Sequence, residues 1–336
     1  MPMRTGILFC LIILSGCSAR SGLIVIQGMT MGTNYSISFA EQPERSITSL
    51  QGEIDEILET INKQMSTYID DSELSQINQS KSQDWLTLSP ELYEVISMAL
   101  QISHLTNGAY DITIGNLVNL WGFGPGEIPQ AVPEDETINI ALKTTGYEYI
   151  ELQSQPHGLK KEYPDIYLDL SSIAKGYAVD RLYDYLEQQG LSGFLVDIGG
   201  EVKSKGVKLN GQNWRIGIEK PLVESREILR VITLTNQAMA TSGDYRNYIV
   251  HNGTRYSHTI DPRTGHPVLH TLLSVSVLHE SAMVADALAT ALLVMGPQKG
   301  TEFAEQNGIA AYFFEARPEN TMESYSSQFS PYLDGN

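Results

Sequence analysis

Cysteine is nearly absent from this chain. The 336 residues include only Cys10 and Cys17. We expect Cys10 to be removed with an N-terminal signal and the sulfur of Cys17 to carry a lipid, so the mature chain forms no internal disulfide. A chain with so few thiols also lacks thiolate zinc sites, iron–sulfur clusters and a cysteine nucleophile.

Basic residues are scarce as well. The sequence has 22 Lys and Arg against 40 Asp and Glu, a formal net charge of −18, and loss of a signal containing Arg4 would give −18 − 1 = −19. Affinity for phosphate backbones depends on clustered Lys and Arg, so we expect no nucleic-acid partner. The sequence has no G-x-S-x-G motif. "GFGPGE" at 122–127 follows no predicted strand and opens no predicted helix, so it is not taken as a dinucleotide-binding loop.

The N-terminus is predicted to be a lipoprotein signal peptide, residues 1–16. Arg4 precedes an apolar run from Ile7 to Leu14, which is too short to span a bilayer and is typical of a signal peptide. The following "LSGC" resembles a bacterial lipobox, in which the cysteine is lipidated. We therefore expect lipidation at Cys17, a short tether over residues 17–27, and an exported lipoprotein anchored in the inner or outer membrane and facing the periplasm.

The rest of the chain, 28–336, contains no repeat and no long linker, which indicates a single unit with two lobes. Tyr35, Ile37 and Phe39 alternate with polar residues as in a half-buried strand, and residues 46–65 have apolar positions at helical spacing. His251-Asn252-Gly253 is a hairpin signal. Strands follow strands as often as they follow helices. This order favours an α+β fold with mostly antiparallel sheets and packed helices.

The segment "MVADALATALLVMG" at 283–296 predicts a helix that is hydrophobic almost all round, yet Asp286 and Thr290 lie one turn apart on one face. A buried carboxylate costs several kcal/mol without a partner. Two interpretations stay open. Either a cation binds these two oxygens, or Asp286 is exposed in the first helical turn while the Thr290 hydroxyl bonds to the carbonyl four residues earlier.

A second junction, "DLSSIAKG" at 169–176, predicts a strand ending at Leu170 and a helix that follows it at once. Free N–H groups at a helix start, together with Lys175, favour an anion. Alternatively, Ser171 or Ser172 is a simple cap and Lys175 is a solvated lysine. The two junctions together suggest a phosphate ligand, with Mg²⁺ between it and Asp286.

Eight segments, taken in chain order, resemble the FAD:protein FMN transferase family, also called ApbE-type flavin transferases, whose fold is related to the T-fold. The match extends from about residue 28 to about residue 300, and it is specific because all eight occur in the same order. They are "MTMGTNYSI", "MSTYIDDSELSQIN", "GAYDITIGNLVNLWGFGP", "DLSSIAKGYAVD", "DIGGEV", "ATSGDYRNY", "HTIDPRTG" and "MVADALATALLVMG".

The resemblance implies a function. Family members transfer FMN from FAD to a threonine hydroxyl of a target protein, such as a subunit of the sodium-pumping quinone reductase or of an electron-transfer complex. They release AMP, require Mg²⁺ and include exported lipoproteins. We expect the protein to modify another protein, without an enzyme-bound intermediate.

The resemblance also implies roles for individual residues. His258 would be the general base, a task that suits the ordinary pKa of histidine, about 6.5. Asp286 and Thr290 would bind the metal together with Ser172. This sequence has Ser171-Ser172 where "DLGGIAKG" is commoner, so the third oxygen is either a hydroxyl or a main-chain carbonyl. The positions matching the flavin site are Met31, Tyr68, Ala109, Tyr110, Asp111, Asp169, Lys175 and Ile260.

Two other functions stay open. Water could replace the threonine, so that the protein hydrolyses FAD to FMN and AMP. Tyr68 argues against this, because family members inclined to hydrolysis tend to carry a small polar residue there. Alternatively, a non-catalytic flavin-binding lipoprotein would need Tyr68 and Lys175 but neither His258 nor Asp286.

Overall fold

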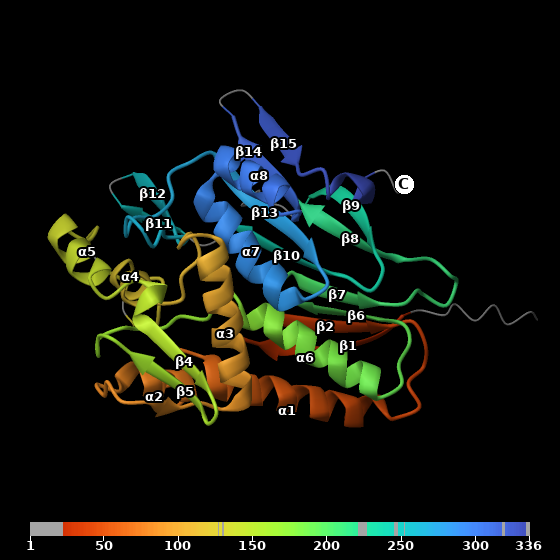
Figure 1. Cartoon of the computed structure of the whole chain (residues 1–336). Helices are drawn as coiled ribbons and strands as arrows, with labels where there is room; N and C mark the ends of the chain where they lie inside the picture. The colour runs from red at the N-terminus through yellow and green to blue at the C-terminus, as the bar shows by residue number, and fades with distance from the viewer. Residues whose placement is uncertain are drawn as a thin grey trace, which may run out of the picture.

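The chain is organised around one antiparallel sheet of eight strands (Figure 1). The structure is a computed structural model that describes residues 23–126, 128–129, 131–220, 227–244, 248–251, 253–317 and 320–333. In sheet order the strands are β1 (Ile24–Thr30), β2 (Thr33–Phe39), β6 (Phe194–Ile198), β7 (Glu201–Lys205), β10 (Ala238–Gly243), β13 (Leu272–His279), β14 (Ala310–Ala316) and β15 (Thr321–Tyr325).

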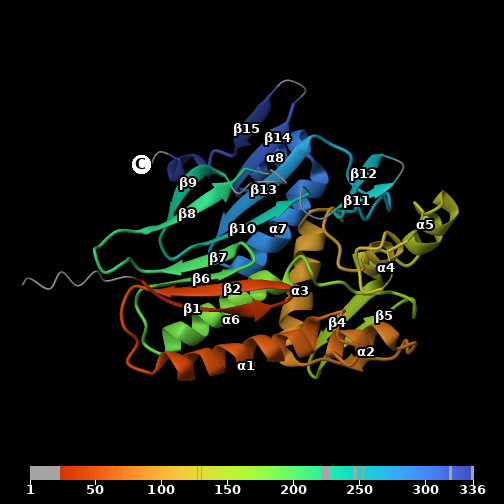
Figure 2. The ribbon, with the colours of Figure 1, turned by 180° about the vertical axis from the view of Figure 1, so that it is seen from behind.

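Helices cover one face of this sheet, and a hairpin covers part of the other. On the first face lie α1 (Ile47–Met65), α6 (Ala174–Gln188), α7 (Ala282–Met295) and α8 (Pro297–Gln306), with α3 (Pro90–Leu105) packed against α1 and α7. Their apolar side chains form the main core with the sheet. The hairpin of β8 (Trp214–Glu219) and β9 (Ile228–Leu234) closes a smaller core on the opposite face, which Figure 2 shows from behind.

The sequence pattern of β2 and α1 explains how they pack. Tyr35, Ile37 and Phe39 are buried, as the alternation predicted. The Ser46 side chain accepts a hydrogen bond from the Ser49 N–H and starts α1. Five of the residues predicted to line the inner face of α1 are buried, namely Leu50, Ile54, Leu58, Ile61 and Met65.

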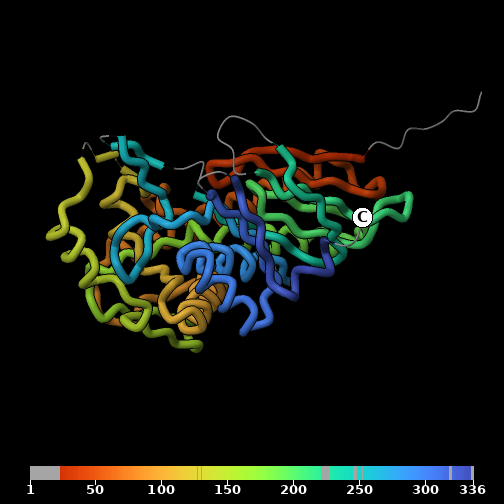
Figure 3. Tube along the Cα trace, turned by 90° about the horizontal axis from the view of Figure 1, so that it is seen from above, coloured from red at the N-terminus to blue at the C-terminus, as the bar shows by residue number. Residues whose placement is uncertain are grey.

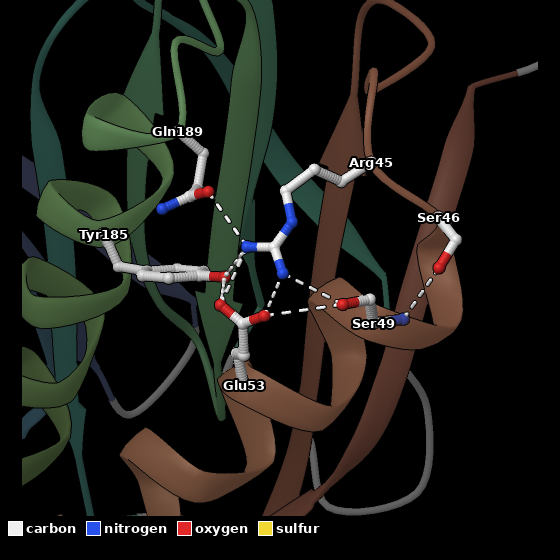
Figure 4. A network of polar contacts seen from close by, with 6 residues as sticks. All are labelled: Arg45, Ser46, Ser49, Glu53, Tyr185 and Gln189. Carbon is white, nitrogen blue, oxygen red and sulfur yellow. Dashed lines mark hydrogen bonds and ion pairs between the residues drawn. The ribbon is translucent and has the colours of Figure 1, made fainter.

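A polar network joins the start of α1 to the end of α6 (Figure 4). The Arg45 guanidinium forms an ion pair with Glu53 and donates to the Gln189 side chain at 3.0 Å. The Tyr185 hydroxyl donates to Glu53 at 2.6 Å. The network fixes the two helices relative to one another along the surface, and it lies away from the cleft described below.

A second lobe lies at one end of the sheet, as the views from the side and from above show (Figures 1 and 3). It contains a three-stranded sheet and several short elements. The sheet consists of β3 (Leu86–Thr87), β5 (His157–Lys161) and β4 (Ile150–Ser154). The other elements of the lobe are α2 (Glu73–Gln79), α4 (Gly115–Leu120), α5 (Asp135–Leu142), a 3₁₀ turn (Tyr147–Tyr149), and the hairpin of β11 (Tyr248–His251) and β12 (Thr254–Ser257). In the main part of the chain, a further 3₁₀ turn (Ser330–Tyr332) follows β15.

Lys161 ties this lobe together internally. Its ammonium is fully buried and donates to the main-chain carbonyls of Ile77, Ser80 and Pro164 at 3.0, 2.8 and 3.0 Å. Burial lowers the pKa of Lys161 to about 8. The expected α+β fold with mostly antiparallel sheets and two lobes is confirmed.

The local structure differs from the expected one at three places. Residues 165–170 do not form the expected strand, because only Tyr167 makes a bridge, to Ile114. The helix predicted to follow at once begins at Ala174. The sheet already includes residues 24–27, which the sequence had suggested as tether, because β1 pairs with β2 from Ile24 onward.

The N-terminal predictions concern a part of the chain that the structure leaves undescribed. The signal peptide and Cys17 lie outside the described residues. Among the residues that are described, none of the helices is long and apolar enough to cross a membrane.

Candidate active site

A cleft of about 290 Å³ lies where the second lobe meets the sheet and its helices. It brings together most of the residues that the sequence had singled out from distant segments. Ten of the predicted site residues line it: Ala109, Tyr110, Asp111, Asp169, Ser172, Lys175, His258, Ile260, Asp286 and Thr290.

The floor of the cleft depends on a close approach between α6 and α7. A Cβ atom on Gly176 would lie 2.3 Å from the Ala282 carbonyl oxygen, so only glycine fits at that position. The Gly176 N–H donates to the Asp286 carboxylate at 3.1 Å. A carboxylate of α7 therefore caps the N-terminus of α6, at the place where the sequence had suggested an external anion.

Asp286 is buried, with 3% of its surface exposed, and it follows the first turn of α7, which begins at Ala282. Burial raises the pKa of this carboxyl group, although Lys175 and the Gly176 N–H partly offset that effect. The Thr290 hydroxyl lies 2.9 Å from the Ser242 hydroxyl. The alternative in which Asp286 was exposed and Thr290 bonded within its own helix is therefore wrong.

Lys175 lies between two buried acidic side chains. Its ammonium is 3.8 Å from Asp286 and 3.7 Å from Glu201. Burial alone would lower the pKa of Lys175, but its interactions with Asp286 first and Glu201 second outweigh burial and raise it. The lysine is therefore a permanent cation in the wall of the cleft, and the interpretation of it as a solvated surface lysine is wrong.

Glu201 is a site residue that sequence analysis missed. Its side chain is buried, its Oε2 atom has no hydrogen-bond partner among the described residues, and burial raises its pKa. The signal was present in "DIGGEV", one of the family-like segments, but a single Glu at the start of a strand gives no hint of its partner. Only the pairing of β7 with β6 and β10 brings it to Lys175.

The start of α6 differs from the predicted capping arrangement. Ile173 is the N-cap residue, and its side chain makes no cap. The Asp169 carboxylate accepts from the Ser171 N–H at 2.7 Å, and the Ser172 hydroxyl donates to the Tyr110 hydroxyl at 3.3 Å. Ser172 therefore lines the cleft without capping the helix.

Asp111 has a different set of partners from Asp169. Its carboxylate accepts from the Thr113 N–H, the Thr113 hydroxyl and the Tyr147 N–H at 2.7–2.8 Å. These bonds lower the pKa of Asp111, but burial outweighs them and raises it. Because most of its hydrogen-bonding capacity is used inside the lobe, Asp111 shapes the cleft wall.

His258 lies directly after β12, and Ile260 follows it in the cleft lining. Two other predicted residues lie elsewhere. Met31 lies in the tight turn between β1 and β2, with φ of 48°, and does not line the cleft. Tyr68 is 66% exposed and is joined to the site indirectly, because its hydroxyl donates to the Phe123 carbonyl at 3.0 Å.

The hydroxyl residues of β10 were also missed. Thr241 and Ser242 line the cleft, and the Thr241 hydroxyl lies 2.7 Å from that of Ser276 on β13. The segment "ATSGDYRNY" had been noted only as part of the resemblance. The packing of β10 under α7 brings the Ser242 hydroxyl to Thr290, whereas the Thr241 hydroxyl bonds across the sheet to β13.

The donor set fits a hard divalent cation that also binds substrate oxygens. No three His, Cys, Asp or Glu side chains within the described ranges cluster closely enough to hold a metal by themselves. Asp286, a buried carboxylate, lies one helical turn before Thr290 on α7, and the Ser172 hydroxyl lines the same cleft. Mg²⁺ commonly takes one or two carboxylates and completes its shell with phosphate oxygens and water.

Comparison with known proteins gives consistent matches. The model of the ApbE family matches residues 31–313. The FAD:protein FMN transferase of Vibrio cholerae is 45% identical over 324 residues, covering 96% of each chain. The FAD:protein FMN transferase of Haemophilus influenzae is 39% identical and covers 94% of this chain and 93% of its own.

Solved structures agree with these matches. The flavin transferase ApbE from Vibrio cholerae superposes with a TM-score of 0.86 at 44% identity, over 93% of this chain and 99% of that one. The apo flavinyl transferase ApbE from Pseudomonas stutzeri gives 0.85 at 36% identity, over 94% and 98%. The chain therefore belongs to the ApbE family.

Proposed function

We propose that this protein is an FAD:protein FMN transferase, which moves FMN from FAD to a protein acceptor. The observation that carries the proposal is the cleft itself, in which a buried carboxylate, a permanently charged lysine and a histidine from three separate segments converge. The family relationship extends over nearly the whole chain, so it includes every residue of this cleft.

In the proposed reaction, an acceptor threonine attacks the phosphorus on the FMN side of FAD. The new bond joins the threonine oxygen to that phosphorus, and the bond from the same phosphorus to the AMP oxygen breaks. His258 takes the hydroxyl proton, and AMP leaves. Negative charge grows on the phosphoryl oxygens, so the placement of cations matters more than covalent participation by the enzyme.

Lys175 is the chain's own cation for this task. Its ammonium is held in the cleft by Asp286 and Glu201, which fixes its position before any ligand binds. A preorganised cation needs no reorganisation during the reaction. We assign Lys175 to the pyrophosphate of FAD.

We further propose that Mg²⁺ binds at Asp286 and Thr290, with an oxygen of Ser172 as third protein ligand. When bound, the ion would neutralise the developing phosphoryl charge. Support comes from the burial of Asp286 and from the hydroxyls beside it. Met31, Tyr68, Ala109, Tyr110, Asp111, Asp169 and Ile260 remain the proposed flavin contacts.

His258 is the proposed general base. Replacement by alanine should lower kcat for transfer by roughly two to four orders of magnitude, the usual range for general base catalysis, with little change in FAD affinity. Near-normal turnover would instead make His258 a structural residue at the end of β12.

The experiment that tests the function uses residues 22–336 with FAD, Mg²⁺ and an acceptor domain that carries a threonine flavinylation motif. Flavin fluorescence on a denaturing gel reports covalent transfer, and chromatography reports AMP and free FMN. Transfer predicts a fluorescent acceptor and AMP in equal amounts. FMN and AMP without a labelled acceptor would indicate hydrolysis, and neither product would indicate a flavin-binding protein.

We also propose that the protein is an exported lipoprotein, anchored through Cys17 and facing the periplasm. The support is the sequence pattern of residues 1–17. Replacement of Cys17 by serine should release the protein from membranes. Continued membrane association of that variant would show that something other than the lipid holds it.

A further inference from the structure

A turn that contacts His258 of the cleft lining, Trp121 to Gly124, has no role in the reaction described so far. It follows α4 and ends that helix in a Schellman motif. The Phe123 N–H donates to the Val118 carbonyl, and the Gly122 N–H donates to the Asn119 carbonyl, both at 3.0 Å. The motif fixes the main chain at Phe123.

Two glycines make this turn specific to its sequence. Gly122 has φ of 78°, and a Cβ there would lie 2.3 Å from the Pro129 side chain. A Cβ on Gly124 would lie 1.8 Å from the Asn119 side-chain oxygen. The segment "GFG" therefore serves close packing of the turn, which explains a glycine pattern that fits no dinucleotide loop.

Phe123 contacts two site residues at once. Its carbonyl accepts the Tyr68 hydroxyl at 3.0 Å. Its ring meets the His258 ring edge to face, with the centroids 6.2 Å apart and an interplanar angle of 71°. Tyr68 and His258 lie 190 positions apart in the sequence, and Phe123 is the link between them.

A hydrogen bond also joins the turn to the segment that contains His258. The buried Trp121 indole N–H donates to the Gly265 carbonyl at 2.8 Å. Gly265 closes the tight turn after His258, because its N–H donates to the Asp261 carbonyl at 2.8 Å. The turn thus contacts the His258 segment both at the histidine ring and shortly after it.

We propose that Phe123 is a positioning residue that holds His258 toward the acceptor and fixes Tyr68 through its carbonyl, and thereby favours a protein hydroxyl over water. This inference rests on the proposed function. Both outcomes break the same phosphorus–oxygen bond of FAD and release AMP. In transfer the threonine oxygen bonds to phosphorus, whereas in hydrolysis a water oxygen does so and free FMN results.

The test measures both products in the wild type and in Phe123→Ala, Phe123→Tyr and Tyr68→Phe. Phe123→Ala should lower kcat for transfer by about tenfold, because a small displacement of a reacting group costs that much or more. The KM for FAD should stay within about twofold, and the ratio of free FMN to labelled acceptor should rise severalfold. The rate should also change its pH profile, since the environment of His258 changes.

Two further variants separate positioning from folding. Phe123→Tyr keeps the aromatic ring, so its transfer rate and pH profile should be close to those of the wild type and unlike those of Phe123→Ala. Tyr68→Phe removes only the bond to the Phe123 carbonyl, so the FMN ratio should rise while the pH profile stays that of the wild type. This variant tests the link even if Phe123→Ala does not fold.

The proposal is overturned if Phe123→Ala keeps the wild-type kcat, or loses activity without any change in product ratio and pH profile. It is also overturned if Tyr68→Phe leaves the ratio unchanged. Failure of the proposed function looks different, because the wild type itself would then label no acceptor.

Discussion

Two aspartates on facing helices cap each other's helix, and they do so very differently. Asp180 on α6 accepts from the Ser281 hydroxyl and the N–H groups of Ala282 and Met283 at 2.7–3.0 Å, and it pairs with Lys203 at 2.6 Å. Asp286 on α7 accepts one N–H at 3.1 Å, and its lysine is 3.8 Å away.

The difference separates a structural carboxylate from one that can bind a ligand. Every strong acceptor position of Asp180 is used, and the helix start it caps is thereby fixed. Asp286 is more deeply buried yet has fewer partners, so its charge is poorly compensated within the protein. An under-compensated buried carboxylate beside an open cleft marks a functional site, whereas a saturated one does not.

The largest expected effect comes from Asp286→Asn. The amide oxygen can still accept from the Gly176 N–H, so the fold should persist while the charge that balances the cation is lost. If the metal stabilises the transition state by about 5 kcal/mol, its loss should lower kcat roughly 10⁴-fold, and excess Mg²⁺ should restore little activity. Activity measured against Mg²⁺ concentration, alongside thermal unfolding, checks this. If the variant kept the Mg²⁺ dependence of the wild type, the proposal that Asp286 binds the metal would be wrong.

The two lysines of the caps provide the next test. Lys175→Met removes the cation that faces the cleft and should lower kcat by roughly 10²–10³-fold. The matched control, Lys203→Met, removes the lysine of the other cap and should cost stability while kcat per folded molecule stays within about tenfold. Equal losses of kcat in the two variants would show that the Asp286–Lys175 pair is no more important for catalysis than the Asp180–Lys203 pair.

Asp180→Asn should reduce stability more than activity, whereas Asp286→Asn should reduce activity more than stability. It weakens a saturated, charge-assisted cap and leaves Lys203 without its counterion, at a cost of about 3 kcal/mol in the free energy of unfolding. Urea denaturation compared with Asp286→Asn measures this. If Asp286→Asn proved the more destabilising of the two, Asp286 would be a structural cap.

Glu201 adds a titratable group to the Asp286 side of the comparison, because its side chain lies 3.7 Å from the Lys175 ammonium. Burial raises the pKa of Glu201 above its ordinary value of 4.5, although Lys175 lowers it in part. The folded state then keeps a proton that the unfolded chain has lost, so stability falls as pH rises above 4.5. Glu201→Gln does not titrate.

The free energy of unfolding of the wild type should therefore fall relative to that of Glu201→Gln as the pH rises from about 5 to about 8. Denaturation midpoints across that range give the difference. A constant difference between the two proteins would show that Glu201 stays ionised in the folded state.

The smallest effect is expected for Thr290→Val, which keeps the volume but removes a neutral oxygen. The Mg²⁺ concentration for half-maximal activity should rise about tenfold, since a hydroxyl ligand contributes less than a carboxylate. Ser242→Ala, which removes the partner hydroxyl of Thr290, is the matched control and should change that concentration less. The reverse order would make Ser242 the more important oxygen.

Several features were determined by the sequence alone, because they depend on short-range patterns. The periodicity of α1 and β2 predicted both elements and their buried faces, and the hairpin residues around Gly253 predicted the pairing of β11 with β12. Eight segments in order were enough for the family. The same family resemblance named the ten predicted site residues that the folded chain brings together in one cleft.

Only the tertiary structure decided how these residues are used. Whether Asp286 was exposed or buried depended on α6 lying against α7 at Gly176, a contact between segments about 110 residues apart. Strand pairing brings Glu201 to Lys175. Local glycines form the turn at Phe123, but only its packing against the segment after β12 brings Phe123 to His258. Burial and charge compensation are properties of neighbours in space, so the sequence supplied the groups while packing determined their chemistry.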